Sequence, residues 1–131
     1  MKIFLVDDEP MIIMAISAIL MREGYSVDTA TDSREALARV SANLTSYDIL
    51  ICDQRMPHLY GVELIEKLRT VGFAGKILIH AGAVERDDEA KMEALGVDAI
   101  LTKPVPMVTF TDTIQRLARS TSSTSVSSVV D

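Results

Sequence analysis

Short apolar runs of the chain end in polar residues that could do chemistry together. The residues at these ends are Asp7 and Asp8, Asp53, His80, and the pair Thr102 and Lys103. Carboxylates gathered in one place repel one another, so such a cluster requires a cation. Oxygen ligands with no cysteine and little histidine favour a hard ion, of which Mg²⁺ is the natural choice. A divalent ion beside a carboxylate and a lysine predicts phosphoryl transfer to an aspartate.

The elements that must position these residues alternate along the chain. The expected strands are Lys2–Val6, Ser26–Ala30, Asp48–Cys52, Lys76–Ile79 and Val97–Leu101. The expected helices lie at about 10–23, from Asp32 to about Leu44, around Leu64–Leu68, at about 85–95, and from about Met107. Strands that alternate with helices predict a doubly wound α/β domain with a parallel sheet. Ligands of such sheets bind beyond the carboxyl ends of the strands, where the polar residues should meet.

Length and composition limit the class of protein. The chain has 131 residues, the size of one domain, and its net charge is −6. An acidic surface argues against direct binding of nucleic acid, which requires basic patches. The single cysteine, Cys52, excludes an intramolecular disulfide framework. We find no apolar run long enough to cross a membrane and no signal-peptide layout, and therefore expect a cytoplasmic protein.

The chain divides into a domain and a tail. We expect residues 1–119 to form the domain and residues 120–131 to be a flexible tail, because serine and threonine dominate there and no reliable periodicity is present. Such a tail leaves no room for a DNA-binding or enzymatic output segment. We therefore expect output through protein contacts, unless the chain is a fragment of something longer.

Taken together, the motifs resemble those of a two-component response-regulator receiver domain, from Met1 to about Arg119. The matching segments are V-D-D-E-P at 6–10, D-Q-R-M-P at 53–57 followed by Gly61, A-L-G-V-D-A at 94–99, and T-K-P at 102–104. The resemblance implies a flavodoxin-like fold: a five-stranded parallel sheet of order 2-1-3-4-5, flanked by five helices. It also implies a protein that is no classical enzyme and catalyses only transfer to, and hydrolysis from, its own aspartate.

The resemblance implies a role for each residue that matches the motifs. Asp53 would be the phospho-acceptor. Asp8 and Asp53 would bind Mg²⁺ directly, Asp7 would act through water, and the backbone carbonyl of Arg55 would supply another metal ligand. Lys103 would contact the phosphoryl group.

Two positions depart from the family pattern. His80 stands where the family usually has Ser or Thr, and Ile100 stands where it usually has Tyr or Phe. In one interpretation, the His80 ring donates a hydrogen bond to the phosphoryl group as part of the switch. In a second, His80 points to solvent and the switch is weakened. In a third, His80 ligates a transition metal.

The residues around the acceptor also bear on the lifetime of its phosphoryl group. In this family the positions of Arg55 and Gly82 influence how water reaches that group. Gly82 has no side chain to orient a water molecule, and Arg55 could lie over the phosphoryl oxygens. Our hypothesis is a comparatively long-lived phosphoryl group.

The expected partners follow from two surfaces. The segment Met11–Met21 contains no charged residue, so part of a methionine-rich helix should lie at the surface and suit adaptable docking. In receivers this helix typically meets a histidine kinase or a histidine phosphotransfer protein. The face made by the fourth helix, the fifth strand and the fifth helix would bind a downstream protein target or form a homodimer, and Ile100 adds apolar character to it. We expect no membrane partner.

Three functions remain in competition. The first is a phospho-accepting receiver of a two-component or phosphorelay system, which receives its phosphoryl group from a partner histidine. The second is a receiver-fold binding module with a lost or altered switch, as His80 and Ile100 suggest. The third is a Mg²⁺-dependent phosphohydrolase, against which Gln54 and Arg55 argue because they leave the chain without the usual Asp-x-Asp motif.

Overall fold

The computed structural model describes residues 1–130, and it describes side chains for residues 1–120. The strands are β1 (Lys2–Val6), β2 (Ser26–Ala30), β3 (Ile49–Cys52), β4 (Lys76–Ala81) and β5 (Ala99–Thr102). The helices are α1 (Pro10–Arg22), α2 (Ser33–Ser41), α3 (Gly61–Thr70), α4 (Arg86–Ala94) and α5 (Met107–Val130). Strands and helices therefore alternate as the sequence predicts.

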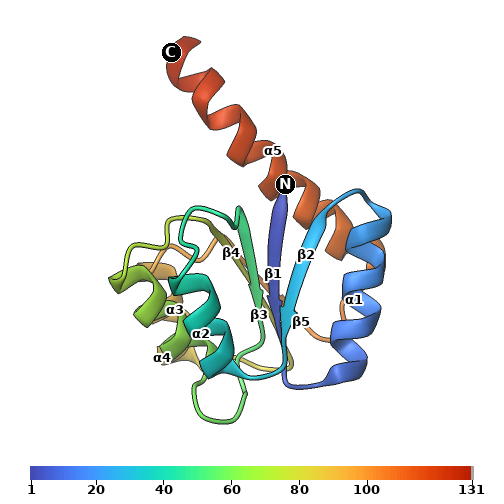
Figure 1. The fold of residues 1–131 in the computed structure, drawn as a ribbon, viewed down its shortest axis with the longest axis vertical. Coiled ribbons are helices and arrows are strands. Elements are labelled where there is room, and N and C mark those ends of the chain that lie inside the picture. The colour runs from blue at the N-terminus through green and yellow to red at the C-terminus, as the bar shows by residue number, and fades with distance from the viewer. Residues whose placement is uncertain (131) are drawn as a thin grey trace.

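The strands form one parallel sheet of order β2-β1-β3-β4-β5. Helices α1 and α5 cover one face of this sheet, and α2, α3 and α4 cover the other (Figure 1). The doubly wound α/β fold expected from the sequence is confirmed.

Each face of the sheet carries its own apolar core, because successive strand residues point to opposite faces. Phe4, Leu50 and Ile77 pack in the cluster that includes residues of α2, α3 and α4. Ile3, Leu5, Ile49, Ile51 and Leu78 pack in the other, with Ile16 of α1 and Phe110 of α5. A sheet covered on both faces presents polar groups only at its edges and strand ends.

The register of the strands brings their carboxyl ends to one level. Val6 pairs with Cys52, so Asp7 and Asp53 leave neighbouring strands side by side. Strand β4 continues to Ala81, two residues beyond its apolar run, because Ala81 pairs with Thr102 of β5. His80 thus lies within β4. The apolar run predicted that this strand ends at Ile79, and that bound is wrong by two residues.

Helix α5 extends beyond the residues whose apolar spacing predicts it. Helix α5 continues as helical backbone to Val130, across most of the segment in which we expected a flexible tail. The side chains of residues 121–131 lie outside the described residues, and the division at residue 119 stays a prediction. Within the described part of the chain, no helix is both long enough and apolar enough to span a membrane.

Candidate functional site

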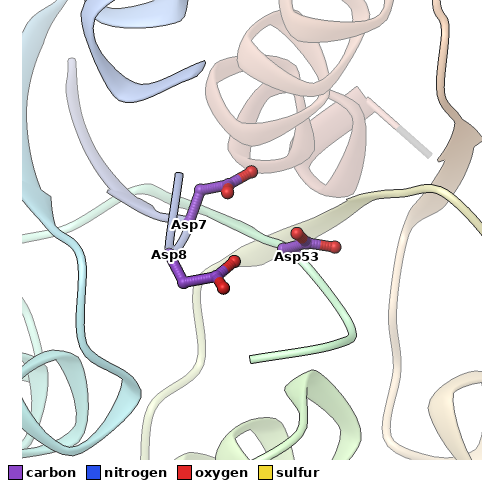
Figure 2. A group of neighbouring side chains, drawn as sticks. All are labelled: Asp7, Asp8 and Asp53. Carbon is purple, nitrogen blue, oxygen red and sulfur yellow. The ribbon is translucent and has the colours of Figure 1, made fainter. Parts of the chain in front are cut away.

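Three carboxylates converge where β1 and β3 end. Asp7, Asp8 and Asp53 each offer an oxygen, and these oxygens lie within 4.8 Å of one another (Figure 2). Asp7 and Asp53 are buried, whereas Asp8 is partly exposed. The site therefore opens to solvent on the side of Asp8, as a site that exchanges ligands must.

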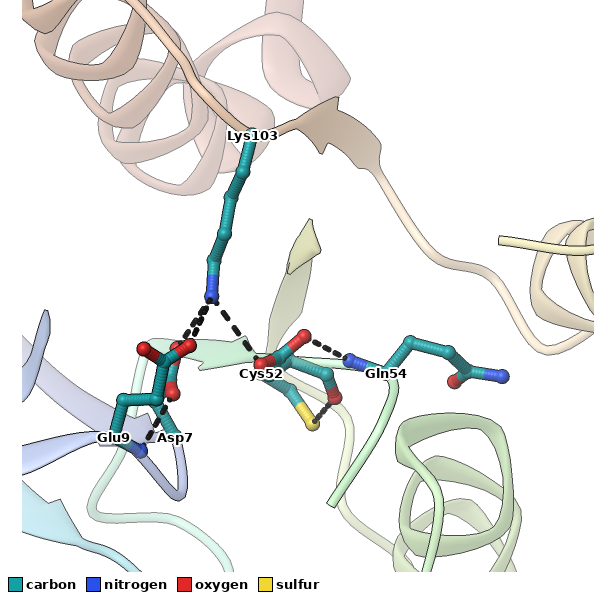
Figure 3. Close-up of polar contacts among 6 residues, drawn as sticks. Asp7, Glu9, Cys52, Gln54 and Lys103 are labelled. Atoms are coloured by element: carbon teal, nitrogen blue, oxygen red, sulfur yellow. Dashed lines mark hydrogen bonds and ion pairs between the residues drawn. The ribbon is translucent and has the colours of Figure 1, made fainter. Parts of the chain in front are cut away.

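Lys103 directly follows the edge strand β5, and its side chain reaches the carboxylates. Its Nζ lies 2.9 Å from Asp7 Oδ2 and 3.2 Å from Asp53 Oδ2 (Figure 3). Glu9 is a looser neighbour, with Oε1 at 4.0 Å from the same ammonium. The structure thus brings together the four residues that the sequence placed at strand ends, Asp7, Asp8, Asp53 and Lys103.

The charges of the site perturb two of these groups. The pKa of Asp53 is raised, first by burial and then by repulsion from Asp7, and Lys103 only partly offsets this. Burial by itself would lower the pKa of Lys103, but the hydrogen bonds and charges of Asp7 and Asp53 outweigh burial, and that pKa is raised. Lys103 therefore stays a cation. Its single positive charge does not balance the three carboxylates, so the cluster favours binding of a further cation.

The arrangement is suited to Mg²⁺. All three candidate ligands are carboxylates, the donors that a hard cation prefers. Asp8 and Asp53 line an open cavity of about 480 Å³ together with Glu9, Arg55, Gly82, Ala83 and Lys103. The buried Asp7 carboxylate offers an oxygen within 4.8 Å of theirs. A cation here would relieve the repulsion that raises the Asp53 pKa. The position of the Arg55 carbonyl oxygen as a further ligand stays a prediction.

The loop after β3 holds the Asp53 carboxylate in place. The backbone N–H of Gln54 donates to Asp53 Oδ1 at 2.7 Å, and the carbonyl of Gln54 accepts from the Gly61 N–H at 2.7 Å. A Cβ at residue 61 would collide with the backbone carbonyl oxygen of Asp53, so this close approach requires glycine. The sequence pattern assigned Gln54 no role in holding the acceptor, since its hydrogen-bond partners are set by the fold.

Arg55 lies at the mouth of the cavity. Its guanidinium is exposed and stands 4.0 Å from Glu85, the residue that precedes α4. Gly82 lines the same cavity, and a Cβ built there meets nothing within 4 Å. The side chain of Arg55 is thus free to turn toward a group bound on Asp53.

His80 lies away from this cavity. Its ring packs edge-on against Phe110 of α5, with ring centroids 5.3 Å apart, and only 7% of the residue is exposed. The interpretation in which His80 points to solvent is therefore wrong. The ring lines a second cavity of about 480 Å³ between α1 and the start of α5, and Lys103 lines both this cavity and the one that contains Asp53.

The environment of His80 predicts a pH dependence of stability. Burial, and then the Lys103 ammonium, lower the pKa of His80 below 6.5, while Asp7 opposes this. Below about pH 6.5 the unfolded chain then binds a proton more readily than the folded chain, so the free energy of unfolding should fall with pH. His80→Phe should lose less stability than wild type between about pH 7 and 5.5 in urea titrations. His58→Asn, which replaces an exposed imidazole, is the matched control. An equal loss in His80→Phe and wild type would contradict the assignment.

The sequence model of one protein family, the response regulator receiver domain, matches residues 3–115 of the chain. The chain belongs to this family. The members of the family are signalling proteins of two-component systems and not classical enzymes. The resemblance drawn from the strand-end motifs is confirmed.

Curated relatives are response regulators. The response regulator RppA of Synechocystis is 35% identical over 119 residues, which is 91% of this chain and 51% of that protein. The alkaline phosphatase synthesis transcriptional regulatory protein PhoP of Bacillus subtilis is 36% identical over 103 residues, which is 79% of this chain and 42% of that protein. The receiver described here thus spans about half the length of the curated relatives it matches.

Solved structures of receivers share the fold over nearly their whole length. The chemotaxis protein CheY4 of Vibrio cholerae superposes with a TM-score of 0.78 at 31% identity, covering 88% of this chain and 97% of that one. A CheY-like receiver domain protein of Methanospirillum hungatei superposes with a TM-score of 0.86 at 26% identity, covering 92% of this chain and 95% of that one. The sheet order 2-1-3-4-5 and its five helices are therefore those of the family.

Proposed function

We propose that this receiver accepts a phosphoryl group from a partner histidine onto Asp53 and signals through protein contacts. The observation that carries the proposal is the Lys103 ammonium between Asp7 and Asp53, at 2.9 Å and 3.2 Å, beside the partly exposed Asp8. This arrangement offers a carboxylate, a cation beside it and two further metal ligands.

Each group of the chain has a defined task in the proposed transfer. An oxygen of Asp53 attacks the phosphorus of the partner's phosphohistidine, the P–N bond breaks, and its electron pair leaves with the imidazole, which takes a proton from solvent. The Gln54 N–H holds the other carboxylate oxygen in place. Lys103 contacts a phosphoryl oxygen after exchanging its bond to Asp53.

Asp8 and Asp53 would hold Mg²⁺ directly, and Asp7 would act through water. When bound, this ion supplies positive charge to the phosphoryl oxygens. A receiver-fold module with a lost switch is not favoured, because Asp7, Asp8, Asp53 and Lys103 are all present and adjacent.

The proposed partner is a histidine kinase or a histidine phosphotransfer protein, and its docking surface is α1. Met11 and Met14 of this helix are 75% and 67% exposed, and Met21 is exposed as well. Exposed methionines suit adaptable contact with a protein surface. The downstream target and a homodimer would use α4, β5 and α5, where Ile100 contributes an apolar side chain. A cytoplasmic location also stays a prediction.

His80 would contact the phosphoryl group only if its side chain changed orientation. Its ring now packs on Phe110 and lines a second cavity, which shares Lys103 with the cavity that contains the acceptor. As a phosphoryl contact, the neutral ring would leave Phe110 and donate its N–H to a phosphoryl oxygen beside Lys103.

An NMR titration with Mg²⁺ and beryllofluoride, which imitates a phosphoryl group on aspartate, tests the proposed function. Mg²⁺ alone should shift the amide signals next to Asp8 and Asp53, and beryllofluoride should add shifts at Gln54 and Lys103 only when Mg²⁺ is present. Asp53→Asn should abolish the second set of shifts. Wild-type spectra that respond to neither addition would overturn the proposal.

The position of Arg55 predicts the lifetime of the phosphoryl group. An exposed guanidinium that is paired only loosely with Glu85 can pair with the phosphoryl oxygens and shield them from water. Arg55→Asn should therefore lose its phosphoryl group about three- to ten-fold faster than wild type, an effect of about 1 kcal/mol on the barrier. The decay is followed by intact mass after removal of the donor. Arg86→Asn is the matched control, and faster decay in wild type than in Arg55→Asn would contradict the hypothesis.

A further inference from the structure

Gln54 uses its backbone N–H and carbonyl and both polar atoms of its side chain to join three parts of the site. Its backbone N–H and carbonyl bind Asp53 and Gly61, as described above. Its side-chain Oε1 accepts from the Val62 N–H at 2.9 Å, and its Nε2 donates to Asp88 Oδ2 at 3.0 Å. Only 2% of the residue is exposed. The residue next to the acceptor is thus fixed to α3 on one side and to α4 on the other.

Helix α4 has few other attachments at its N-terminal end. Met92 is its one buried residue among the described ones. Lys91 pairs with Glu66 of α3 at 3.3 Å, but both side chains are about half exposed, and such pairs contribute little. Glu85, just before the helix, faces Arg55 at 4.0 Å in solvent. Within the described part of the chain, the bond between Gln54 and Asp88 is therefore the one partly buried side-chain hydrogen bond that holds the first turns of α4 to another element.

His80 and Ile100 replace the Ser or Thr and the Tyr or Phe that the family usually has at the two switch positions. His80 packs against Phe110 of α5 and lines a cavity with residues of α1, on the face of the sheet opposite α4 (Figure 1). Ile100 carries no hydroxyl group. A signal that reaches α4 therefore needs another physical contact, and the contact that the structure offers is the Gln54 side chain.

We propose that Gln54 couples the state of Asp53 to α4 through its hydrogen bond with Asp88, and that a phosphoryl group on Asp53 breaks this bond and releases the first turns of α4. The inference rests on the proposed function, because it needs that group on Asp53. When Asp53 becomes an acyl phosphate, the oxygen that accepts from the Gln54 N–H changes from a carboxylate oxygen to a neutral carbonyl oxygen and accepts more weakly, so this N–H turns toward the new phosphoryl oxygens. The added negative charge also repels Asp88.

The linkage is reciprocal, since a contact that opposes one state of Asp53 must be weakened by that state. Gln54 acts here as a positioning residue. Truncating Gln54 itself would leave the buried Val62 N–H without its partner and could unfold the protein. Asp88 is the better target because its removal leaves the bond between Gln54 and Val62 intact.

The experiment records ¹H–¹⁵N spectra of the full chain with Mg²⁺, before and after addition of beryllofluoride. In wild type we expect shifts at Gln54 and Lys103 and also along Arg86–Ala94. In Asp88→Ala the shifts at Gln54 and Lys103 should persist, while those along α4 fall to less than half, because the helix is already released. Beryllofluoride should also bind Asp88→Ala about five-fold more tightly than wild type, as linkage requires.

Two matched variants separate the hydrogen bond from charge. Asp87→Ala removes an exposed acid from the same turn and should keep the full α4 response. Asp88→Asn removes the charge but keeps an oxygen that can accept from Gln54 Nε2, so it should also keep most of the response. A full α4 response in Asp88→Ala, or an equal loss in Asp87→Ala, would overturn the inference while the site shifts uphold the proposed function. No response at Gln54 and Lys103 in wild type would overturn both.

Discussion

Asp53→Asn is expected to abolish phosphoryl acceptance and to make the metal-free protein harder to unfold. An amide is a poor nucleophile toward phosphorus, so acceptance should fall by a factor of about a thousand or more. The stability gain follows from the raised pKa of Asp53, which arises from burial and from Asp7. A carboxyl group whose pKa is raised by folding costs stability when it is ionised, so the cost is full near neutral pH.

The expected gain in the free energy of unfolding at about pH 7 is about 1 kcal/mol. It should shrink as the pH falls toward the unfolded value of 3.8, where wild-type Asp53 is itself protonated in the folded protein. Urea titrations without Mg²⁺ measure it, and Asp112→Asn, an exposed acid on α5, is the control. An Asp53→Asn protein that is no more stable than wild type would remove the electrostatic argument for a cation site.

Lys103→Met is expected to have the largest effect on stability. The ammonium lies between two buried carboxylates, Asp7 and Asp53, and is itself only 18% exposed in its side chain. Removing one partner of a buried ion pair leaves uncompensated charge, so the free energy of unfolding should fall by about 3 kcal/mol. Mg²⁺ should restore part of this loss, because it would supply positive charge to the same carboxylates.

Lys91→Met provides the matched comparison. Lys91 pairs with Glu66 on the surface at 3.3 Å, and loss of an exposed pair should cost less than about 1 kcal/mol. Both variants remove one ammonium and keep a long apolar side chain. The difference between their free energies of unfolding therefore measures the effect of burying the ion pair. Equal losses in the two variants would mean that Lys103 does not hold the carboxylates together.

The site could be predicted because its residues are placed by the sheet. Asp7, Asp8, Asp53 and Lys103 each follow an apolar run, and parallel strands bring their carboxyl ends to one edge. The order of strands and helices along the chain is enough to place these four residues together. The paired residues Val6 and Cys52 show that it holds at the level of single residues.

Contacts between elements could not be predicted in the same way. The direction of His80 depends on two further residues of β4 that pair with β5, beyond the point where the apolar run ends. The bond between Gln54 and Asp88 joins residues 34 positions apart, and no local periodicity encodes it. The exposure of Met11 and Met14 was predictable, since a helix without charge cannot bury every face.

Phosphorylation of the wild-type chain by acetyl phosphate, followed by intact mass measurement and peptide mapping, tests the central claim most directly. With Mg²⁺, we expect one phosphoryl group per chain, located on the peptide that contains Asp53. With EDTA in place of Mg²⁺, we expect none. The absence of an adduct, its location on another residue, or its formation without a divalent ion would contradict the account.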